Sequence, residues 1–311
     1  MAEDAQSTEA VDADPIEASL ARARTVWGII AVIILGAIGG GVGLWASQQV
    51  APQPVIGIVR LYGTIDFFSY ADYLGPLHIA AERDDVAAVV ILVDSGGGLA
   101  TVSEELFYTV LDLREDKPVV ASIEGVSASG AYYATAPANW MVARPAAIVG
   151  SIGVRSGFPP ESFPDDETLT TGPFKDVGRS TTDFLRDIDS IALAFSTNIY
   201  DQRSWVLENM HEESRLDLLP PVEEVATGQV WTAARAFELG LVDEIGSNLD
   251  AIERAAELAG VRNYEVIDLF AEFIELDDTD FAGFSTDRPE PTWYEEGPWP
   301  QFYYFYGTDE E

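Results

Sequence analysis

Apolar runs alternate with helical patterns through the middle of the chain. The β-branched runs Val55–Leu61 and Val86–Val93 are typical of strands that are buried on both faces of a sheet. Each is followed by apolar residues at helical spacing, around 71–83 and then 102–114, and further strands are predicted at 118–123 and 140–143. Because strands and helices alternate, the pattern predicts an α/β fold with a mostly parallel sheet and right-handed crossovers.

One N-terminal stretch has a different character. Val26 to Ala46 carries no charge, and as a helix it is long enough to cross a hydrocarbon core of about 30 Å. It is longer than the apolar region of a cleaved signal peptide, which favours an uncleaved transmembrane helix. Arg22 and Arg24 precede it, so the positive-inside tendency places the acidic segment 1–25 in the cytoplasm and the remainder outside.

These patterns divide the chain into four parts. We expect an N-terminal segment at 1–25, a transmembrane helix at 26–46, a folded domain at 52–270 and an acidic, aromatic tail at 271–311. The tail is too aromatic for ordinary disorder, and its sequence is compatible with docking on the protein or on the membrane interface.

The charge balance narrows the classes of function. Acidic residues number 53 against 17 basic ones, for a formal net charge of −36. Such a surface repels phosphates, which argues against nucleic-acid binding. Many acids, no cysteine and two lysines (Lys117 and Lys175) predict adaptation to high salt, where self-repulsion is screened, and we expect a protein of a halophilic archaeon.

The sequence lacks the residue types that several common catalytic systems require. No cysteine is present, so thiol nucleophiles and thiolate metal sites are excluded. The two histidines, His78 and His211, lie in a helical pattern and at an acidic helix end, which gives a Ser-His-Asp triad little support. Paired carboxylates stay open, because acids occur throughout the chain.

Three short segments carry candidate chemistry. The glycine run Asp94–Gly98 ends a strand before a helix, which fits an anion site or a plain turn. Ser129 stands among small residues at a strand-to-helix junction, where a hydroxyl can face a cleft beside backbone amides. Lys175 is retained in a chain nearly free of lysine, and lysine can act as a base when desolvation lowers its pKa, whereas arginine cannot.

Taken together, these segments resemble the SppA family of serine proteases, which share the Clp-protease/crotonase fold. The resemblance covers Val55 to Leu269. The family's Asn-Ser-Pro-Gly-Gly and Ala-Ser-Gly-Gly-Tyr elements have counterparts at 94–98 and 128–132, with Asp94 and Gly96 in place of the asparagine and the proline and Ala131 in place of a glycine. Further family elements follow in order at 150–154, 172–178, 230–233 and 239–246.

The resemblance implies a role for each matching residue. Ser129 is implied as the nucleophile and Lys175 as the general base, with Ser151 orienting the lysine. The amides of Gly97 and Gly130 are implied as the oxyanion hole.

The resemblance also implies a membrane-anchored serine endopeptidase that degrades cleaved signal peptides or other short apolar peptides. It implies a homo-oligomeric ring and no metal or nucleotide cofactor. Two alternatives stay open: a broader membrane quality-control peptidase, and an inactive scaffold on the same fold. An acyl-CoA enzyme of the wider crotonase fold is disfavoured, because no basic cluster is evident for the CoA phosphates.

Overall fold

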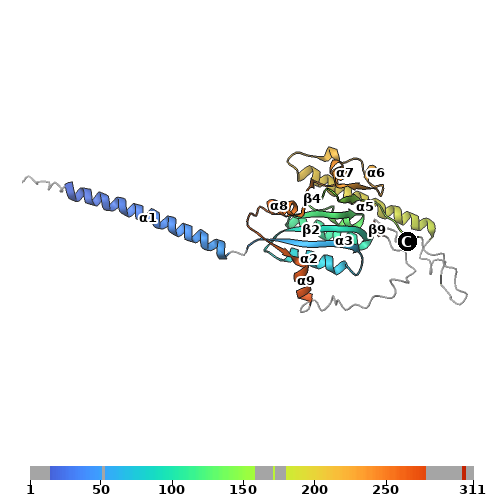
Figure 1. Cartoon of the computed structure of the whole chain (residues 1–311), viewed down its shortest axis with the longest axis horizontal. Coiled ribbons are helices and arrows are strands. Elements are labelled where there is room, and N and C mark those ends of the chain that lie inside the picture. The colour runs from blue at the N-terminus through green and yellow to red at the C-terminus, as the bar shows by residue number, and fades with distance from the viewer. Residues whose placement is uncertain (1–14, 51–52, 158–170, 172–179, 278–302, 306–311) are drawn as a thin grey trace, which may run out of the picture. The chain divides into compact units, whose positions relative to one another are not determined.

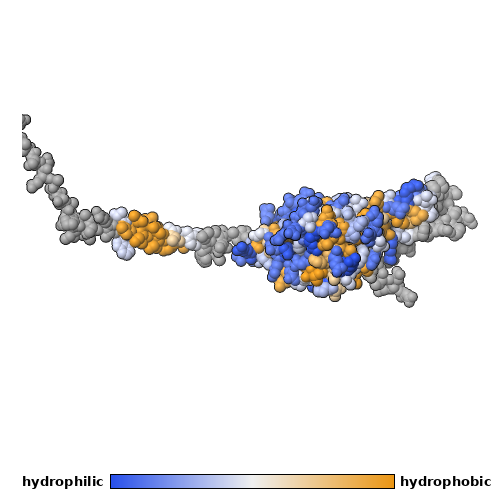
Figure 2. All heavy atoms as spheres, turned by 90° about the horizontal axis from the view of Figure 1, so that it is seen from above, coloured by the Kyte–Doolittle hydropathy of each residue, from blue (hydrophilic) through white to orange (hydrophobic). Residues whose placement is uncertain are grey.

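The computed structural model describes residues 15–50, 53–157, 171, 180–277 and 303–305. The chain divides into two units, Met1–Pro52 and Gln53–Glu311. The described part of the first unit is the helix α1 (Pro15–Val50), which extends beyond the predicted span at both ends. Its segment Arg24–Gly43 is 20 residues long, exposed and apolar enough to cross a membrane, a test that a signal sequence also passes. Figure 2 shows the apolar side chains gathered along this helix.

The second unit is built on one mixed sheet of nine strands within the described residues. Its central order is β6-β5-β3-β2-β1-β8, while β4 and β7 extend from β3, and β9 pairs with β2. All pairs are parallel except β5 with β6 and β2 with β9, which confirms the predicted α/β fold with a mostly parallel sheet. The strands are β1 (Val55–Ile65), β2 (Val86–Leu99), β3 (Val119–Ala128), β4 (Trp140–Ala143), β5 (Ile148–Gly150), β6 (Val230–Thr232), β7 (Glu244–Ile245), β8 (Glu265–Asp268) and β9 (Tyr303–Phe305).

Helices cover both faces of the sheet (Figure 1). Alternate residues of each central strand enter opposite cores: Val89 joins the larger core, and Val90 joins a smaller one that α8 closes with Ala251 and Ala255. This explains why the strand sequences are almost continuously apolar. The helices are α2 (Tyr70–Glu82), α3 (Ala100–Asp116), α4 (Gly130–Thr135), α5 (Thr181–Asn209), α6 (Val222–Val225), α7 (Ala233–Glu238), α8 (Asn248–Leu258) and α9 (Leu269–Asp277), with a 3-10 turn at Leu216–Leu218.

The glycine run differs from the prediction. Asp94–Gly98 is not a turn at a helix N-terminus, because β2 continues through it to Leu99 and stays paired with β1. Two backbone requirements account for two of the three glycines. Gly97 has a φ of +97°, and a Cβ on Gly98 would lie 1.9 Å from the carbonyl oxygen of Ile65. Part of this run therefore serves close strand approach.

The boundary predicted between 270 and 271 falls inside helix α9. Leu269 and Phe273 are buried, and the Phe273 ring packs so closely on α2 that a Cβ on Gly75 would lie 2.3 Å from it. Arg83, just after α2, forms an ion pair with Glu272 of α9. The first residues assigned to the tail are therefore part of the fold.

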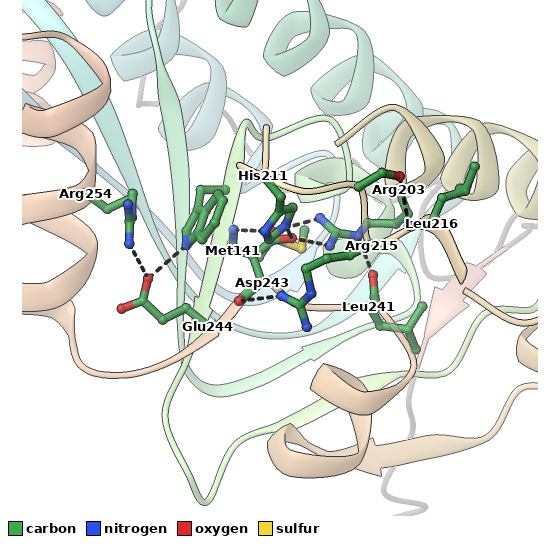
Figure 3. A network of polar contacts seen from close by, with 12 residues as sticks. Met141, Arg203, His211, Arg215, Leu216, Leu241, Asp243, Glu244 and Arg254 are labelled. Atoms are coloured by element: carbon green, nitrogen blue, oxygen red, sulfur yellow. Dashed lines mark hydrogen bonds and ion pairs between the residues drawn. The ribbon is translucent and has the colours of Figure 1, made fainter. Parts of the chain in front are cut away.

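A buried ionic network ties α5 to the sheet (Figure 3). Arg203 of α5 donates to both carboxylate oxygens of Asp243, at 3.0 and 2.7 Å, and through Nε to the carbonyl of Gly240. Asp243 also accepts a hydrogen bond from the backbone amide of Met141 at 2.8 Å and contacts His211 Nε2 at 3.0 Å. Such a pair is stable only because the remaining lone pairs of the carboxylate are satisfied as well.

Candidate active site

Ser129 occupies the junction between β3 and α4 in an unusual backbone conformation. Its φ is 55° and its ψ is −123°, a region that side chains rarely adopt. Its amide donates to the carbonyl of Gly150 at 2.7 Å, and its own carbonyl accepts from the amide of Tyr133 at 2.9 Å. The Oγ is buried and has no hydrogen-bond partner in the described part of the chain. A strained, unsatisfied hydroxyl of this kind is typical of a reactive position.

Ser151 lies directly beside Ser129. Strands β3 and β5 are parallel neighbours, with Ala128 opposite Gly150, so each serine is the residue that follows its strand. Ser151 has a φ of 53°, is buried, and donates its amide to the carbonyl of Gln229 at 2.7 Å. These two serines are the non-glycine residues with positive φ among those that the structure describes. Strain is therefore concentrated at the point where sequence analysis places the catalytic serines.

The neighbouring elements hold this junction rigidly. Gly150 has a φ of +119°, and a Cβ there would lie 2.6 Å from the Trp231 ring of β6. Helix α4 is fully buried, and its Tyr133 ring stacks on Phe107 with centroids 4.6 Å apart. Ala131, which replaces a family glycine, is buried in the main core, so the fold accommodates its methyl group.

Gly97 lies at the same end of the sheet as Ser129. Strands β2 and β3 pair at Ser95 and Ser127, so Gly97 and Ser129 each stand two residues further along. The Gly97 amide donates to Ser95 Oγ at 3.1 Å, and Ser95 Oγ donates to the carbonyl of Gly63 at 2.5 Å. Ser95 thus orders the glycine segment, a role that sequence reasoning did not assign to it although it stands inside the motif.

Asp94, which stands in place of the family's asparagine, has a structural function. Its Oδ1 accepts the amide of Val126 at 2.9 Å, where the register between β2 and β3 shifts. The carboxylate therefore replaces a strand-to-strand hydrogen bond at the point where the two strands diverge.

Lys175 lies outside the described residues, and so does the whole of its motif at 172–178. Lys117 is bound at the opposite end of the sheet, where its Nζ donates to the carbonyls of Ala80 at 2.6 Å and Arg83 at 2.6 Å. It caps helix α2, and burial lowers the pKa of its amine. Strand β3, with 10 residues, separates Lys117 from Ser129 by roughly 30 Å at about 3.3 Å per residue. Lys117 cannot therefore act on Ser129.

Neither histidine lies at the Ser129 end of the sheet. His211 contacts Asp243 and the ring of Trp140, which is opposite Val120 near the start of β3. His78 is exposed near the end of α2, the helix that leads back to the start of β2. A Ser-His-Asp triad at Ser129 is therefore not formed by these residues.

A buried serine with a strained backbone, at a strand-to-helix turn of a mostly parallel sheet, defines a site of the serine-hydrolase kind. Residues 112–162 and 164–262 match the sequence model of peptidase family S49. The matched part of the chain, which contains Ser129, Ser151 and all of α5, is similar to this family.

Several relatives of this chain are named as proteases. A protein of Methanocaldococcus jannaschii named as a protease is 33% identical over 63% of this chain and 64% of its own length. Protease 4 of Salmonella typhi is 33% identical over 58% of this chain and 30% of its own length. A protein of Enterococcus faecium named as a signal peptide peptidase SppA is 26% identical over 67% of this chain and 63% of its own length. The chain thus spans less than two thirds of these relatives.

Solved structures show a more distant likeness. The 1510-N membrane-bound stomatin-specific protease, solved in complex with a substrate peptide, is 14% identical, with a TM-score of 0.44 over 70% of this chain and 93% of its own.

Proposed function

We propose that this chain is a serine endopeptidase in which Ser129 is the nucleophile and Lys175 the general base. The observation that carries the proposal is the geometry of Ser129 and Ser151: two adjacent serines with φ of 55° and 53°, at the ends of neighbouring parallel strands. The Ser129 hydroxyl is held in a fixed, buried position without a hydrogen bond from the described residues. Such a hydroxyl is available to a base that approaches from elsewhere.

The proposed reaction forms an acyl-enzyme. Neutral Lys175 takes the proton of Ser129 Oγ, and the oxygen attacks the carbonyl carbon of the scissile peptide bond. The amide of Gly130 and that of Gly97, which exchanges Ser95 Oγ for the substrate oxygen, stabilise the oxyanion, and Lys175 returns the proton to the leaving amine. Water then hydrolyses the ester with the same lysine as base. Ser151 holds the lysine amine in position through its hydroxyl.

The remaining parts of the proposal concern location and substrate. Helix α1 anchors the chain in a membrane, with residues 1–25 in the cytoplasm and the peptidase unit outside. Its substrates are signal peptides left after cleavage, or other short apolar peptides in extended form, and the active assembly is a homo-oligomeric ring. The name of the Enterococcus faecium relative and the exposed apolar stretch of α1 support this reading. The net charge of −36 supports operation in molar salt, as in a halophilic archaeon.

The decisive experiment measures cleavage of short apolar fluorogenic peptides by the full chain in detergent micelles and molar salt. Ser129→Ala and Lys175→Arg should each lower kcat/KM by about 10⁴-fold or more while leaving the fold unchanged by circular dichroism. Arginine keeps the positive charge of Lys175 but cannot accept the proton, so this variant tests base catalysis specifically.

Lys117→Arg is the matched control, since it makes the same change at the lysine that caps α2. It should retain activity within a few-fold of the parent. Equal activity in the parent, Ser129→Ala and Lys175→Arg chains would point to another nucleophile. Folded but inactive chains throughout would favour the scaffold alternative, and cleavage of a wide range of unrelated peptides would favour the quality-control alternative.

A further inference from the structure

The last strand of the sheet comes from the C-terminal segment of the chain. Strand β9 (Tyr303–Phe305) pairs antiparallel with β2, with Gly97 opposite Phe305, Gly98 opposite Tyr304 and Leu99 opposite Tyr303. It also contacts α3 and α4. The sequence left open whether this aromatic segment docks on the protein or on a membrane; the structure places these three residues on the protein.

The edge that β9 occupies is open for a clear reason. Strand β2 pairs with β3 only as far as Ser95 and Ser127, after which β3 turns away to pair with β5. Beyond that point β2 keeps β1 on one side, through Gly97 and Gly98, and has no central strand on the other. A strand edge of this kind exposes backbone donors and acceptors to an extended peptide, which can add to the sheet.

This open edge lies beside the nucleophile. Gly97 follows the last pair between β2 and β3 by two residues, and so does Ser129. Helix α4, which begins at the residue after Ser129, contacts both β2 and β9, so the edge lies near the reactive serine. Ser129 itself is 0% exposed in this arrangement. A peptide bond presented to Ser129 would have to run along the same edge.

We propose that Tyr303–Phe305 is an internal occupant of the peptide-binding edge of β2 and inhibits the peptidase in cis. This inference rests on the proposed function of Ser129. The ligand of this edge is an extended peptide that is held through its backbone. It is rich in aromatic residues and has no proline at the paired positions. Because the occupant is a short strand tethered to the same chain, it closes the edge at an effective concentration of about a millimolar, and a substrate peptide displaces it.

Two C-terminally truncated chains, each otherwise identical to the full chain, test the proposal. A chain that ends after Phe302 lacks β9, whereas a chain that ends after Phe305 keeps it and loses the same acidic terminus. If β9 occupies the edge about 90% of the time, the first truncation raises kcat/KM by about tenfold and the second leaves it unchanged. Equal activity in both truncations and the parent, abolished by Ser129→Ala, would overturn the inference while leaving the proposed function intact.

A double substitution separates the backbone pairing from simple loss of residues. Alternate residues of an antiparallel strand donate to the partner strand, so Tyr303→Pro with Tyr304→Pro removes at least one donor to β2 and should activate the full chain as the shorter truncation does. Tyr303→Phe with Tyr304→Phe keeps every backbone donor and should behave like the parent. Activation by both double variants, or by neither, would contradict pairing through the backbone.

A binding measurement keeps the inference testable without catalysis. A fluorescent peptide with the sequence of residues 301–307 should bind the Ser129→Ala chain that ends after Phe302, detected by anisotropy. It should bind at least about tenfold more weakly to the Ser129→Ala chain that ends after Phe305, whose edge is filled. Absent or equal binding would overturn the inference. Selective binding combined with no activity in any chain would support the peptide edge and refute the proposed peptidase.

Discussion

Replacement of Arg203 by methionine should be among the most destabilising single changes in the α/β unit. The side chains of Arg203 and Asp243 are both 0% exposed and share two hydrogen bonds at 3.0 and 2.7 Å. Methionine preserves much of the volume but leaves the Asp243 carboxylate charged in the interior. The loss of one partner of such a pair costs about 3–5 kcal/mol, which corresponds to roughly 6–20 °C in Tm for a domain of this size.

The assay is thermal and urea unfolding followed by circular dichroism at one fixed salt concentration. Arg235→Met provides the matched control, because the Arg235–Glu238 pair is more than half exposed on both sides and should contribute at most about 1 kcal/mol. The double variant Arg203→Met/Asp243→Leu removes both charges and should be more stable than Arg203→Met alone. A loss below about 1 kcal/mol for Arg203→Met, or a double variant that simply adds the two single effects, would refute the reasoning.

Three further outcomes follow from the same structure. Ser151→Ala should lower kcat by about 10–100-fold with little change in KM, since it removes a positioning hydroxyl and not a substrate contact, as steady-state kinetics would show. Gly98→Ala should unfold at a clearly lower urea concentration than Gly153→Ala, because its Cβ would meet the Ile65 carbonyl at 1.9 Å, whereas the Gly153 Cβ would find its nearest neighbour at 3.6 Å. Asp243→Asn should flatten the loss of stability between about pH 5 and pH 2 in acid unfolding curves.

The sign of the last prediction follows from the surroundings of the carboxylate. Burial raises the pKa of Asp243, but the charge of Arg203 and the hydrogen bonds from His211, Arg203 and the Met141 amide lower it more, to below its ordinary value. The folded state then binds this proton more weakly than the unfolded chain does. Its contribution to stability is complete above the unfolded pKa of about 3.9 and is lost as the pH falls through the folded pKa. A carboxamide has no such dependence.

The central strands were predictable because burial on both faces requires continuous apolar sequence. Val86–Val93 shows this pattern, and β2 contains it. Its continuation through Asp94–Leu99 was not predictable, since glycines in a strand are unfavourable unless another backbone approaches closely, as Ile65 does here. Strand β5 (Ile148–Gly150) is too short to show any period, yet it brings Ser151 to Ser129.

The sequence motifs predicted only part of the candidate active site. Ser129 stands out by its small neighbours, but its positive φ depends on the packing of α4 and on the Gly150 carbonyl, which no local pattern encodes. Arg203 lies in a helix with acidic neighbours, a pattern typical of a surface residue. Its burial could not be predicted, because its partner Asp243 lies 40 positions away in the sequence. An ion pair between residues far apart in the sequence leaves no periodic signal. The pairing of Tyr303–Phe305 with β2 also joins distant parts of the chain, and it could not be predicted for the same reason.

The capping of α2 by Lys117 has a practical consequence for chemical labelling. The chain has two lysines, and the Nζ of Lys117 is bound to the carbonyls of Ala80, Ala81 and Arg83. These hydrogen bonds lower the reactivity of Lys117 toward amine-reactive acylating reagents. Besides the terminal amine, Lys175 is therefore the side-chain amine that such reagents should modify first. Mass-spectrometric readout of acylation at Lys175 would report how far its amine is neutral and how readily solvent reaches it, with Lys117 as the internal reference in the same molecule.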